Sequence, residues 1–429
     1  MTLAEELKWR GFIQDTTLEN AERLDDHAWT LYIGFDATAL SQTVGNLAPM
    51  MAVKTFLRHG HKAIILAGGA TSLIGDPGGK ENERILQSKD RIAANVANAQ
   101  AQFALIFGKA PVTYVNNLDW YKDFNVLDFL RDVGKNFSMT PLIQRDYIAS
   151  RLGEGGAGIS YAEFSYTLLQ GYDYLKLFED YGCNLQLGGS DQWGNCISGV
   201  DLIRRKHGQA VHVVTLPLVI NQATGKKFGK SEEQTVWLDP ALTHPSDFYQ
   251  FWLNTSDLDA LNYLKIFTEL DKEEIEGVGR EQAADPAGRA AQRRLAESVT
   301  AAIHGADNLR ICRAFAQLAF PGSRKDKGAD ADWPDVLELE PAARKIRLGD
   351  GTGSWQPAVL FDELLSKLPG VESRTQIKEL LDNKAVKVVV KNAEDTDLSI
   401  QPLDSRRTAL GGEPVLIIIG KNTIRAIAE

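Results

Sequence analysis

The residues with the clearest chemical potential lie in glycine-rich segments that could hold phosphate. The loop at 225–231 reads GKKFGKS, and its lysines could close over phosphate groups or could form an ordinary solvated loop. The segment at 34–49, GFDATALSQTVGNLAP, joins a predicted strand to a helix predicted to begin near Asn46 with Pro49 in its first turn. Small residues at the start of this helix leave room for a ligand, and the free N–H groups there attract phosphate.

A polar stripe is the second chemical feature. Tyr166, Gln170 and Asp173 lie at i, i+4 and i+7 within EFSYTLLQGYDYL, which places them on one face of a predicted helix. Such a face fits either a binding surface or a hydrogen-bonded core network, and the spacing leaves both open. Glycine pairs at 68–69 and 188–189 follow predicted strands and suit close approach of the backbone to a neighbour.

Two other glycine motifs fail as nucleotide signatures. Gly153, Gly155 and Gly158 fit GxGxxG, but they follow a helical pattern rather than a strand, so we interpret the run as a loop. The segment GDPGGK at 75–80 lacks the Ser or Thr that a phosphate loop requires after its lysine.

The glycine-rich segments and the polar stripe lie among short apolar runs that alternate with helical patterns. Five runs have the composition of strands and are bounded by turn signals: 30–35, 62–67, 112–116, 184–187 and 211–216. This alternation predicts an α/β fold with a doubly wound parallel sheet, which binds ligands beyond the carboxyl ends of its strands. The residues that follow positions 35, 67, 187 and 216 are therefore expected to lie near a ligand.

The pattern changes beyond residue 219. Residues 245–320 are predicted to be mostly helical, and 321–355 are interrupted by Gly, Pro and charged residues as in a linker. The remainder reads as a smaller unit with helices at 358–368 and 373–383 and strands at 385–390 and 415–419.

The composition is that of a soluble globular protein with several domains. The 429 residues are 44% hydrophobic and 24% charged, without an apolar run long enough for a membrane helix or a signal peptide at the N-terminus. Cys183, Cys196 and Cys312 are too far apart for a disulfide framework or a metal pair, which favours a reducing cytoplasm. The net charge of -10 argues against a uniformly basic nucleic-acid binder, but it permits a local patch at 204–206.

The chemical segments together resemble a known family. YIGFDATA, GGATSLIGDPGGK, FLRDVGKNFSM, EFSYTLLQGYD, LQLGGSDQWGN and KFGKS are similar in order and spacing to the bacterial-type tyrosyl-tRNA synthetases, which are class I aminoacyl-tRNA synthetases. The resemblance covers nearly the whole chain. It implies a tyrosine–tRNA ligase that activates tyrosine with ATP to tyrosyl-adenylate and transfers tyrosyl to the 3′ end of tRNA(Tyr).

The resemblance also implies a domain order. A Rossmann-like catalytic domain is expected at 1–218, and an α-helical anticodon-side domain that includes the KFGKS loop at 219–330. A linker at 331–355 would lead to a small α+β, S4-like RNA-binding domain at 356–429.

Residue roles follow from the same resemblance. Tyrosine would be bound by Tyr32, Asp76, Tyr166, Gln170, Asp173 and Gln192, of which Tyr32 and Asp173 meet the phenol. ATP would be bound by Gly34, Asp36, Gly45, Asn46, Asp191, Lys80, Arg84 and Phe228. The leaving pyrophosphate would be stabilised by the catalytic set Thr38, Thr43, Lys227, Lys230 and Ser231. The tRNA would be contacted by Arg204, Arg205, Arg374 and Lys378.

Cofactors and partners are expected as follows. Mg²⁺ would accompany ATP as a substrate complex, with no tightly bound cofactor and no metal site built from protein ligands. Tyrosine, ATP and tRNA(Tyr) are the expected partners, together with a second copy of the chain through the 125–138 region. No membrane association is expected, and the predicted location is cytoplasmic.

One segment departs from the family pattern. Thr43-Val44-Gly45-Asn46 stands where the family has His, an apolar residue, Gly, then His or Asn. Leu40 and Gln42 also stand where an Asp and a Leu are usual. That histidine normally helps Thr38 stabilise the pyrophosphate, and one such donor contributes on the order of 3 kcal/mol. Thr43 therefore predicts slowed tyrosine activation with tyrosine binding largely kept.

Two other classes stay open at this point. The altered 40–43 segment would fit a non-catalytic RNA-binding protein built on a synthetase body. A second alternative is another nucleotide-activating enzyme, such as a tryptophanyl relative, although Tyr32, Asp173 and SDQWGN favour tyrosine. A purely structural protein is disfavoured, because polar and glycine motifs cluster at the expected strand ends.

Overall fold

The computed structural model describes residues 1–76, 86–153, 155–222, 225, 228 and 235–319, together with five strands between 346 and 428. The chain divides into two compact units. The first comprises Met1–Thr243 and Thr255–Ala284, and the second comprises His244–Asn254 and Asp285–Glu429. The domain boundaries expected from the sequence stay a prediction.

The first unit is built on a six-stranded sheet with the order β1-β6-β5-β2-β3-β4. The short β1 (Asp15–Thr16) pairs antiparallel with β6, and the other strands run parallel. The parallel strands are β2 (Thr30–Asp36), β3 (Lys62–Gly68), β4 (Val112–Asn116), β5 (Leu185–Gly189) and β6 (His212–Leu216). All of the strands predicted for this half are thus confirmed to within two residues at each end.

The sheet contains a point where the strand order reverses, between β2 and β5. These strands pair only at Leu31–Leu185 and Tyr32–Gln186, so they are not bonded to each other beyond those residues. Ligands of doubly wound sheets bind in the crevice outside the carboxyl ends at such a point. The topology therefore directs attention to the residues that follow Tyr32 and Gln186.

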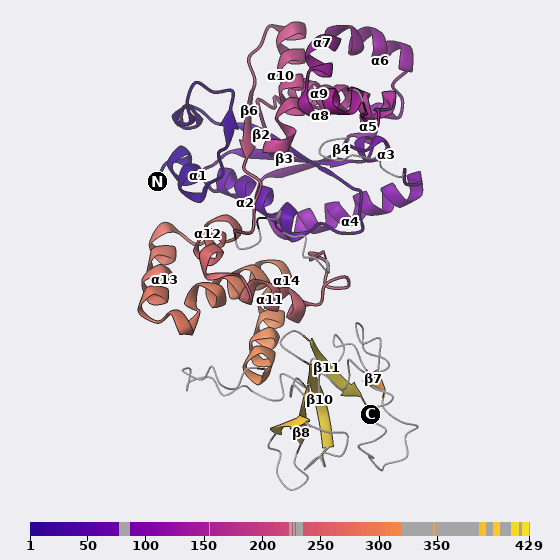
Figure 1. Ribbon diagram of the computed structural model, residues 1–429. Helices are drawn as coiled ribbons and strands as arrows, with labels where there is room; N and C mark the ends of the chain where they lie inside the picture. Colours follow the sequence, from indigo (N-terminus) through magenta and orange to yellow (C-terminus); the bar gives the residue numbers. More distant parts are fainter. Residues whose placement is uncertain are drawn as a thin grey trace. The chain divides into compact units, whose positions relative to one another are not determined.

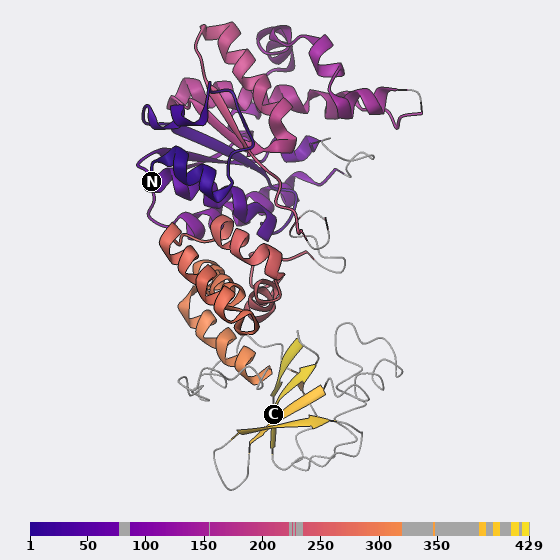
Figure 2. The same cartoon turned by 60° about the vertical axis from the view of Figure 1, so that its left-hand side comes forward.

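Helices cover both faces of this sheet. Helices α2 (Val44–Arg58) and α4 (Lys89–Phe107) lie on one face, and α9 (Tyr161–Tyr181) and α10 (Trp193–His207) lie on the other (Figures 1 and 2). Every residue of β3 after Lys62 is buried, as expected for a parallel strand covered on both faces. The shorter elements of the first unit are α1 (Leu3–Arg10), η1 (Ala21–Asp25), α3 (Thr71–Ile74), α5 (Leu118–Tyr121), α6 (Val126–Asp132), η2 (Gly134–Asn136), α7 (Met139–Ile143), α8 (Asp146–Leu152), η3 (Ser190–Gln192), α12 (Asp257–Phe267) and α13 (Lys272–Ala284).

The predicted start of α2 was wrong by two residues. The helix begins at Val44 rather than near Asn46, so Pro49 lies in its second turn. Val44 is fully buried, and Thr43 has the extended backbone of a residue that precedes a helix. Asn46 is therefore the third helical residue, placed where its side chain can bond back to Thr43. The glycine run at 153–158 lies between α8 and α9, which confirms its interpretation as a loop.

The second unit contains α11 (Pro245–Leu253), η4 (Pro286–Gly288) and α14 (Ala290–Ala319), and α14 is interrupted at Gly305, whose φ is 84°. Together with α12 and α13, these helices confirm the helical prediction for 245–320. Phe248 and Trp252 on α11 are fully buried in this unit.

A five-stranded sheet with the order β7-β11-β10-β8-β9 follows in the same unit, drawn mostly in yellow in Figure 2. Its strands are β7 (Ile346–Arg347), β8 (Val386–Lys391), β9 (Leu398–Leu403), β10 (Glu413–Ile419) and β11 (Thr423–Ala428). The two predicted strands correspond to β8 and β10, whereas the other three were not predicted. The predicted helices at 358–368 and 373–383 lie outside the described residues.

Two further expectations concern membranes and cysteines. Among the described residues, no helix combines the length and apolarity required to cross a bilayer. The three cysteines are buried free thiols, and burial raises the pKa of Cys196 and of Cys312 to about 12.

Candidate functional site

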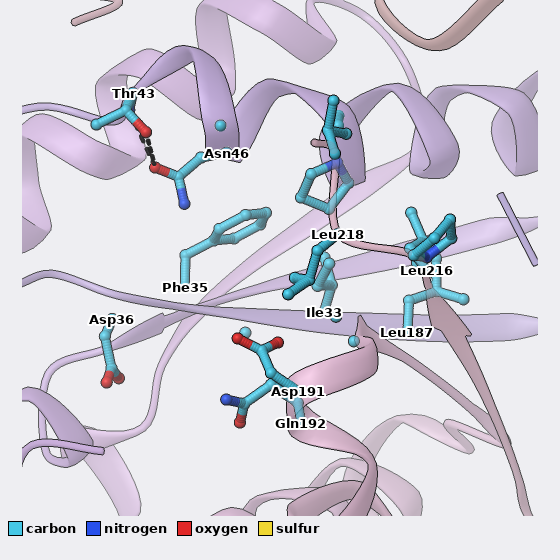
Figure 3. A pocket seen from close by; sticks show the side chains of 18 of the residues that line it. Ile33, Phe35, Asp36, Thr43, Asn46, Leu187, Asp191, Gln192, Leu216 and Leu218 are labelled. Atoms are coloured by element: carbon cyan, nitrogen blue, oxygen red, sulfur yellow. Dashed lines mark hydrogen bonds between the residues drawn. The ribbon is translucent and has the colours of Figure 1, made fainter. Parts of the chain in front are cut away.

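A large cavity of the first unit lies at the crevice between β2 and β5. Its volume is about 760 Å³, enough for a ligand of nucleotide size. In Figure 3 the start of α2 lies on one side of this cavity, and Asp191 and Gln192 lie on the other. The cavity is lined by every described member of the predicted tyrosine-binding, ATP-binding and catalytic sets: Tyr32, Gly34, Asp36, Thr38, Thr43, Gly45, Asn46, Asp76, Tyr166, Gln170, Asp173, Asp191, Gln192 and Phe228.

The most buried carboxylate of the cavity belongs to Asp173 on α9, which is 2% exposed. Its Oδ2 accepts a hydrogen bond from Asn117 Nδ2 at 3.0 Å, and its Oδ1 accepts one from Trp120 Nε1 at 2.9 Å. Burial raises the pKa of Asp173 to about 7, and side-chain hydrogen bonds from Asn117, Trp120 and Tyr121 oppose this rise. The carboxylate is therefore fixed in orientation while remaining close to a change of charge near neutral pH.

The hydroxyl of Tyr32 lies buried in the same cavity without a hydrogen-bond partner among the described residues. Burial raises the pKa of Tyr32 well above its usual range, and the nearby Cys196 and Asp173 add to the rise. Buried polar groups are rarely left unpaired, because each unmade bond costs about 1–3 kcal/mol. A ligand with its own hydroxyl at this end would satisfy Tyr32.

A second carboxylate, Asp36, ends β2. Its Oδ2 accepts from the Tyr166 hydroxyl at 3.0 Å, and its Oδ1 accepts from Thr71 Oγ1 at 2.7 Å. A Cβ at Gly68 would lie 2.4 Å from both Asp36 Oδ1 and Thr71 Oγ1, so only glycine permits this bond. The close approach predicted at the 68–69 glycines is thus made to protein side chains.

A chain of hydrogen bonds fixes the opposite wall of the cavity. Gln192 Nε2 donates to Asp76 Oδ2 at 2.7 Å, and Gln192 Oε1 accepts from Asn195 Nδ2 at 3.0 Å. Asn195 Oδ1 accepts in turn from Thr167 Oγ1 at 2.7 Å and from Arg145 Nη1 at 3.3 Å. Because each amide is bonded at both ends, the orientation of Gln192 toward Asp76 is determined.

The loop between β2 and α2 is held by a carboxamide ladder, which we define as Asn95, Asn98 and Gln102 on α4. Their spacing of i, i+3 and i+7 places them on one helical face. All of them bond to the loop, mostly to its backbone, so the path of the loop depends little on its own side chains. The bonds run from Asn95 Nδ2 to Ala37 O at 2.9 Å, from Asn98 Nδ2 to Leu40 O at 3.3 Å, from Gln42 N to Gln102 Oε1 at 2.9 Å and from Gln102 Nε2 to Ser41 Oγ at 2.9 Å.

The end of this loop is anchored on its other side by the segment at 236–239. Val44 N donates to Val236 O at 3.1 Å, and Leu238 N donates to Gln42 O at 2.9 Å, so Thr43 faces Trp237 in an antiparallel bridge. Asn46 Oδ1 accepts from the Thr43 backbone N–H at 3.0 Å and from the Thr43 hydroxyl at 2.9 Å. Figure 3 shows this contact beside the cavity.

The predicted tRNA-contacting arginines lie outside the cavity, in the last turn of α10. Arg204 is paired with Asp201 at 2.6 Å. Arg205 donates to Asn136 O and lines a second cavity of about 220 Å³. The remaining predicted site residues lie outside the described part of the chain: Lys80, Arg84, Lys227, Lys230, Ser231, Arg374 and Lys378.

Several residues of the site were not predicted from the sequence. Asn117 and Trp120 follow β4, so the strand-end rule applied to the other strands would have found them. Thr71 and Asn195 lie within the motifs after β3 and β5 but were given no role, and Arg145 has no comparable signal because it bonds residues that are distant in sequence. The carboxamide ladder could have been noticed only as a polar helix face.

Comparison with known proteins gives consistent matches. The family of tRNA synthetases class I (W and Y) matches residues 24–318. The tyrosine–tRNA ligase of Geobacillus kaustophilus (strain HTA426) is 46% identical over 402 residues, which are 92% of this chain and 93% of that one. The tyrosine–tRNA ligase of Bacillus caldotenax is 42% identical over the same shares of both chains. A crystal structure of a C-terminally truncated mitochondrial tyrosyl-tRNA synthetase from Aspergillus nidulans has a TM-score of 0.67 and 31% identity, covering 74% of this chain and 94% of that one.

Proposed function

Because the chain belongs to the class I tRNA synthetases for tryptophan and tyrosine, we propose that it is a tyrosine–tRNA ligase. It joins tyrosine to ATP as tyrosyl-adenylate and then transfers the tyrosyl group to the 3′ end of tRNA(Tyr). One observation carries the proposal: a single cavity contains both the buried Tyr32 and Asp173 side chains and the N-terminus of α2.

Tyrosine binds with its phenol at Tyr32 and Asp173. The ionised Asp173 accepts the phenol proton in a hydrogen bond, and Tyr32 exchanges a second bond with the same oxygen. Phenylalanine leaves the Tyr32 hydroxyl buried without a partner and removes the phenol bond to Asp173, and each loss costs about 1–3 kcal/mol. Tryptophan has a donor but no acceptor at its ring edge, so it leaves the Tyr32 O–H proton without an acceptor.

The ammonium and carboxylate of tyrosine lie toward the middle of the cavity. Asp76, Tyr166 and Gln170 hold the ammonium, and Gln192 lies beside the amino acid. The bond between Gln192 and Asp76 supports this arrangement, because it keeps a carboxylate oxygen and an amide together on one wall. Gly34, Asp36 and Asp191 face the junction with the nucleotide and its ribose.

Activation joins the two substrates without a general base. The α-carboxyl has a pKa of about 3.3–3.7, so it is ionised at neutral pH and attacks the α-phosphorus directly. A new O–P bond forms, and the bond from the α-phosphorus to the bridging oxygen of pyrophosphate breaks. The protein positions two anions and stabilises the charge on the leaving group. Thr38, Thr43, Gly45, Asn46 and Phe228 border the nucleotide, and Mg²⁺ accompanies ATP as part of the substrate.

The lysine loop and the tRNA contacts extend this scheme, in part to residues outside the described part of the chain. Lys227, Lys230 and Ser231 reach the pyrophosphate, with Lys80 and Arg84 nearby. In the second step a ribose hydroxyl of the tRNA attacks the tyrosyl carbonyl and AMP leaves. Arg204 and Arg205 contact the acceptor arm, and Arg374 and Lys378 act within an S4-like C-terminal domain.

The chain acts as a homodimer in the cytoplasm. Support for the dimer comes from α6, where Val126 is 67% exposed and Leu127 is 72% exposed. Neighbouring apolar side chains this exposed are typical of a surface that is covered in an assembly. Sedimentation equilibrium of the purified chain measures its mass directly and contradicts the dimer if only the monomer is found.

Tyrosine-dependent exchange between ATP and pyrophosphate tests the proposed activity. We expect robust exchange with tyrosine and at least about a hundredfold less with phenylalanine or tryptophan, because of the unpaired groups described above. An absence of exchange with every amino acid would favour a non-catalytic RNA-binding protein. Preference for tryptophan would favour the tryptophanyl branch of the family.

The departure at position 43 is tested in the same assay. A Thr43→His variant supplies the donor that the family places beside Thr38, so its activation rate should rise by about a hundredfold, the usual contribution of such a donor. The Michaelis constant for tyrosine should change less than twofold. An unchanged rate would show that position 43 does not limit activation.

A further inference from the structure

The Thr43 side chain lines the cavity and is hydrogen-bonded to a neighbouring residue of α2. Its hydroxyl donates to Asn46 Oδ1 at 2.9 Å, and its backbone N–H donates to the same oxygen at 3.0 Å. A backbone N–H can only donate, so the carboxamide atom that it meets is the oxygen. The Asn46 nitrogen must then face the other way.

The free end of this carboxamide is directed at the cavity. Figure 3 shows the Asn46 nitrogen turned away from Thr43, into the space between α2 and the strands. Asn46 lines the cavity, and its NH₂ group makes no hydrogen bond with the described residues. An amide nitrogen in this position is a donor for phosphate or ribose oxygens.

The Thr43 backbone, which carries both donors to Asn46, is held in place by its neighbours. Hydrogen bonds from Val44 N to Val236 O and from Leu238 N to Gln42 O hold the chain on both sides of Thr43. If the carboxamide rotated by half a turn, its NH₂ would face the Thr43 N–H, which is an unfavourable contact of two donors. The backbone N–H therefore sets the orientation of the carboxamide, and the bond from the Thr43 hydroxyl holds the carboxamide in place.

We propose that Thr43 is a positioning residue, which fixes the Asn46 carboxamide with its NH₂ toward the ATP-binding end of the cavity. The inference rests on the proposed function, because it assigns ATP oxygens as the acceptors. It explains how a chain without the usual histidine retains an oriented donor at the start of α2. Thr43 thus acts on ATP through Asn46, and the tyrosine end of the cavity is unaffected.

The Thr43→His variant cannot test this inference, because it adds a donor for phosphate and removes the hydroxyl together. Thr43→Val removes only the hydroxyl and keeps the shape. We expect it to raise the dissociation constant of ATP, measured by equilibrium titration, and the Michaelis constant for ATP by about fivefold, the usual effect of one neutral hydrogen bond. The Michaelis constant for tyrosine should stay within twofold. Thr43→Ser restores the hydroxyl and should recover most of the ATP affinity lost in Thr43→Val.

A double-mutant cycle separates positioning from direct contact. If Thr43 acts through Asn46, Thr43→Val should weaken ATP binding by less than about 1.5-fold in an Asn46→Ala background. An undiminished fivefold effect in that background would overturn the proposal, because Thr43 would then contact ATP itself. Equal ATP affinity of the wild-type protein and Thr43→Val would also overturn it.

The titration needs no turnover, so it separates this inference from the proposed function. Missing exchange in a wild-type protein that binds ATP would contradict the proposed function alone, whereas equal affinity of Thr43→Val and wild type would contradict the inference alone. The comparison of Thr43→Val with Thr43→Ser remains decisive even if the Asn46→Ala proteins do not fold.

Discussion

The two ends of the cavity are built on different principles. At the Asp173 end, side chains bond to side chains inside the protein: Asn117 is fully buried and Asp173 is 2% exposed. At the α2 end, side chains of α4 bond mostly to the backbone of the loop between β2 and α2, in which Leu40 is 48% exposed and Gln42 is buried. The arrangement at the Asp173 end depends on the identity of each side chain in it. The arrangement at the α2 end depends mainly on backbone N–H and C=O groups of the loop, which do not depend on its side chains.

This difference predicts unequal sensitivity to mutation. Removing one side chain from a buried cluster leaves its partner without a hydrogen bond. The variant then loses the full desolvation free energy of that partner. A loop backbone bonded at several points loses one support when a single carboxamide is removed, and its other bonds remain. The loop can also vary in sequence, which is consistent with Leu40, Gln42 and Thr43 departing from the family pattern in that segment.

The largest effect is expected from Asp173→Asn. An asparagine has one acceptor oxygen, whereas the carboxylate accepts from both Asn117 and Trp120, so one donor would face the new NH₂ group. The variant also lacks the charge that accepts the phenol. We expect kcat/KM for tyrosine in pyrophosphate exchange to fall by about a thousandfold, equivalent to about 4 kcal/mol.

Asp180→Asn is the matched control, because Asp180 lies on the same helix with its side chain 41% exposed and paired with Lys176. That variant should remain within twofold of the wild-type protein. A loss of less than tenfold in Asp173→Asn would show that the buried end is no more sensitive than the loop end, and the contrast between the two ends would be lost.

The next effect is a pH dependence confined to the buried end. Asp173 has a pKa of about 7, so its ionised fraction falls about tenfold between pH 8 and pH 6. Tyrosine affinity should fall by the same factor as the pH is lowered, because only the carboxylate accepts the phenol proton. Phenylalanine has no phenol proton, so its affinity should not fall, and discrimination between the two amino acids should shrink toward pH 6.

The effect on stability has the opposite sign. The folded-state pKa of Asp173 lies above the unfolded value of about 3.9, so the contribution of this group to stability is present at low pH and is lost as the pH rises through about 7. Equilibrium binding of both amino acids at pH 6, 7 and 8 measures the affinity effect. Tyrosine affinity that is constant over this range would contradict the assigned role of Asp173.

The sequence predicted one end of the cavity better than the other. The stripe of Tyr166, Gln170 and Asp173 was visible because helical spacing places residues on one face whatever the tertiary structure does. Asp36 was found because a parallel sheet collects strand ends at one edge. Both rules depend on the geometry of helices and sheets, and the predicted strands agree closely with β2 to β6.

The supporting residues were missed for a physical reason. Asn117 and Arg145 act on residues far away in the chain, and no periodicity records such a pairing. The start of α2 was also misplaced, because the helix signal was taken from Pro49 while the bond between Thr43 and Asn46 begins the helix earlier. The loop end was hardest to predict, because its acceptors are backbone carbonyls that any residue provides.

The smallest effect is expected from a change in the carboxamide ladder at Gln102. This variant tests directly whether the α2 end of the cavity is less sensitive than the Asp173 end. Gln102 makes two bonds to the loop, so Gln102→Met keeps the length of the side chain and removes both. The loop retains its bonds to Asn95 and Asn98 and to the 236–239 segment, so we expect the Michaelis constant for ATP to rise only about threefold to fivefold, with that for tyrosine unchanged. Gln100→Met on the same helix, where the side chain makes no hydrogen bond with the described residues, is the control and should not alter either constant. A loss approaching that of Asp173→Asn would mean that the loop end is as dependent on single side chains as the buried end. An effect of Gln102→Met on the tyrosine constant would mean that the two ends are coupled through the loop.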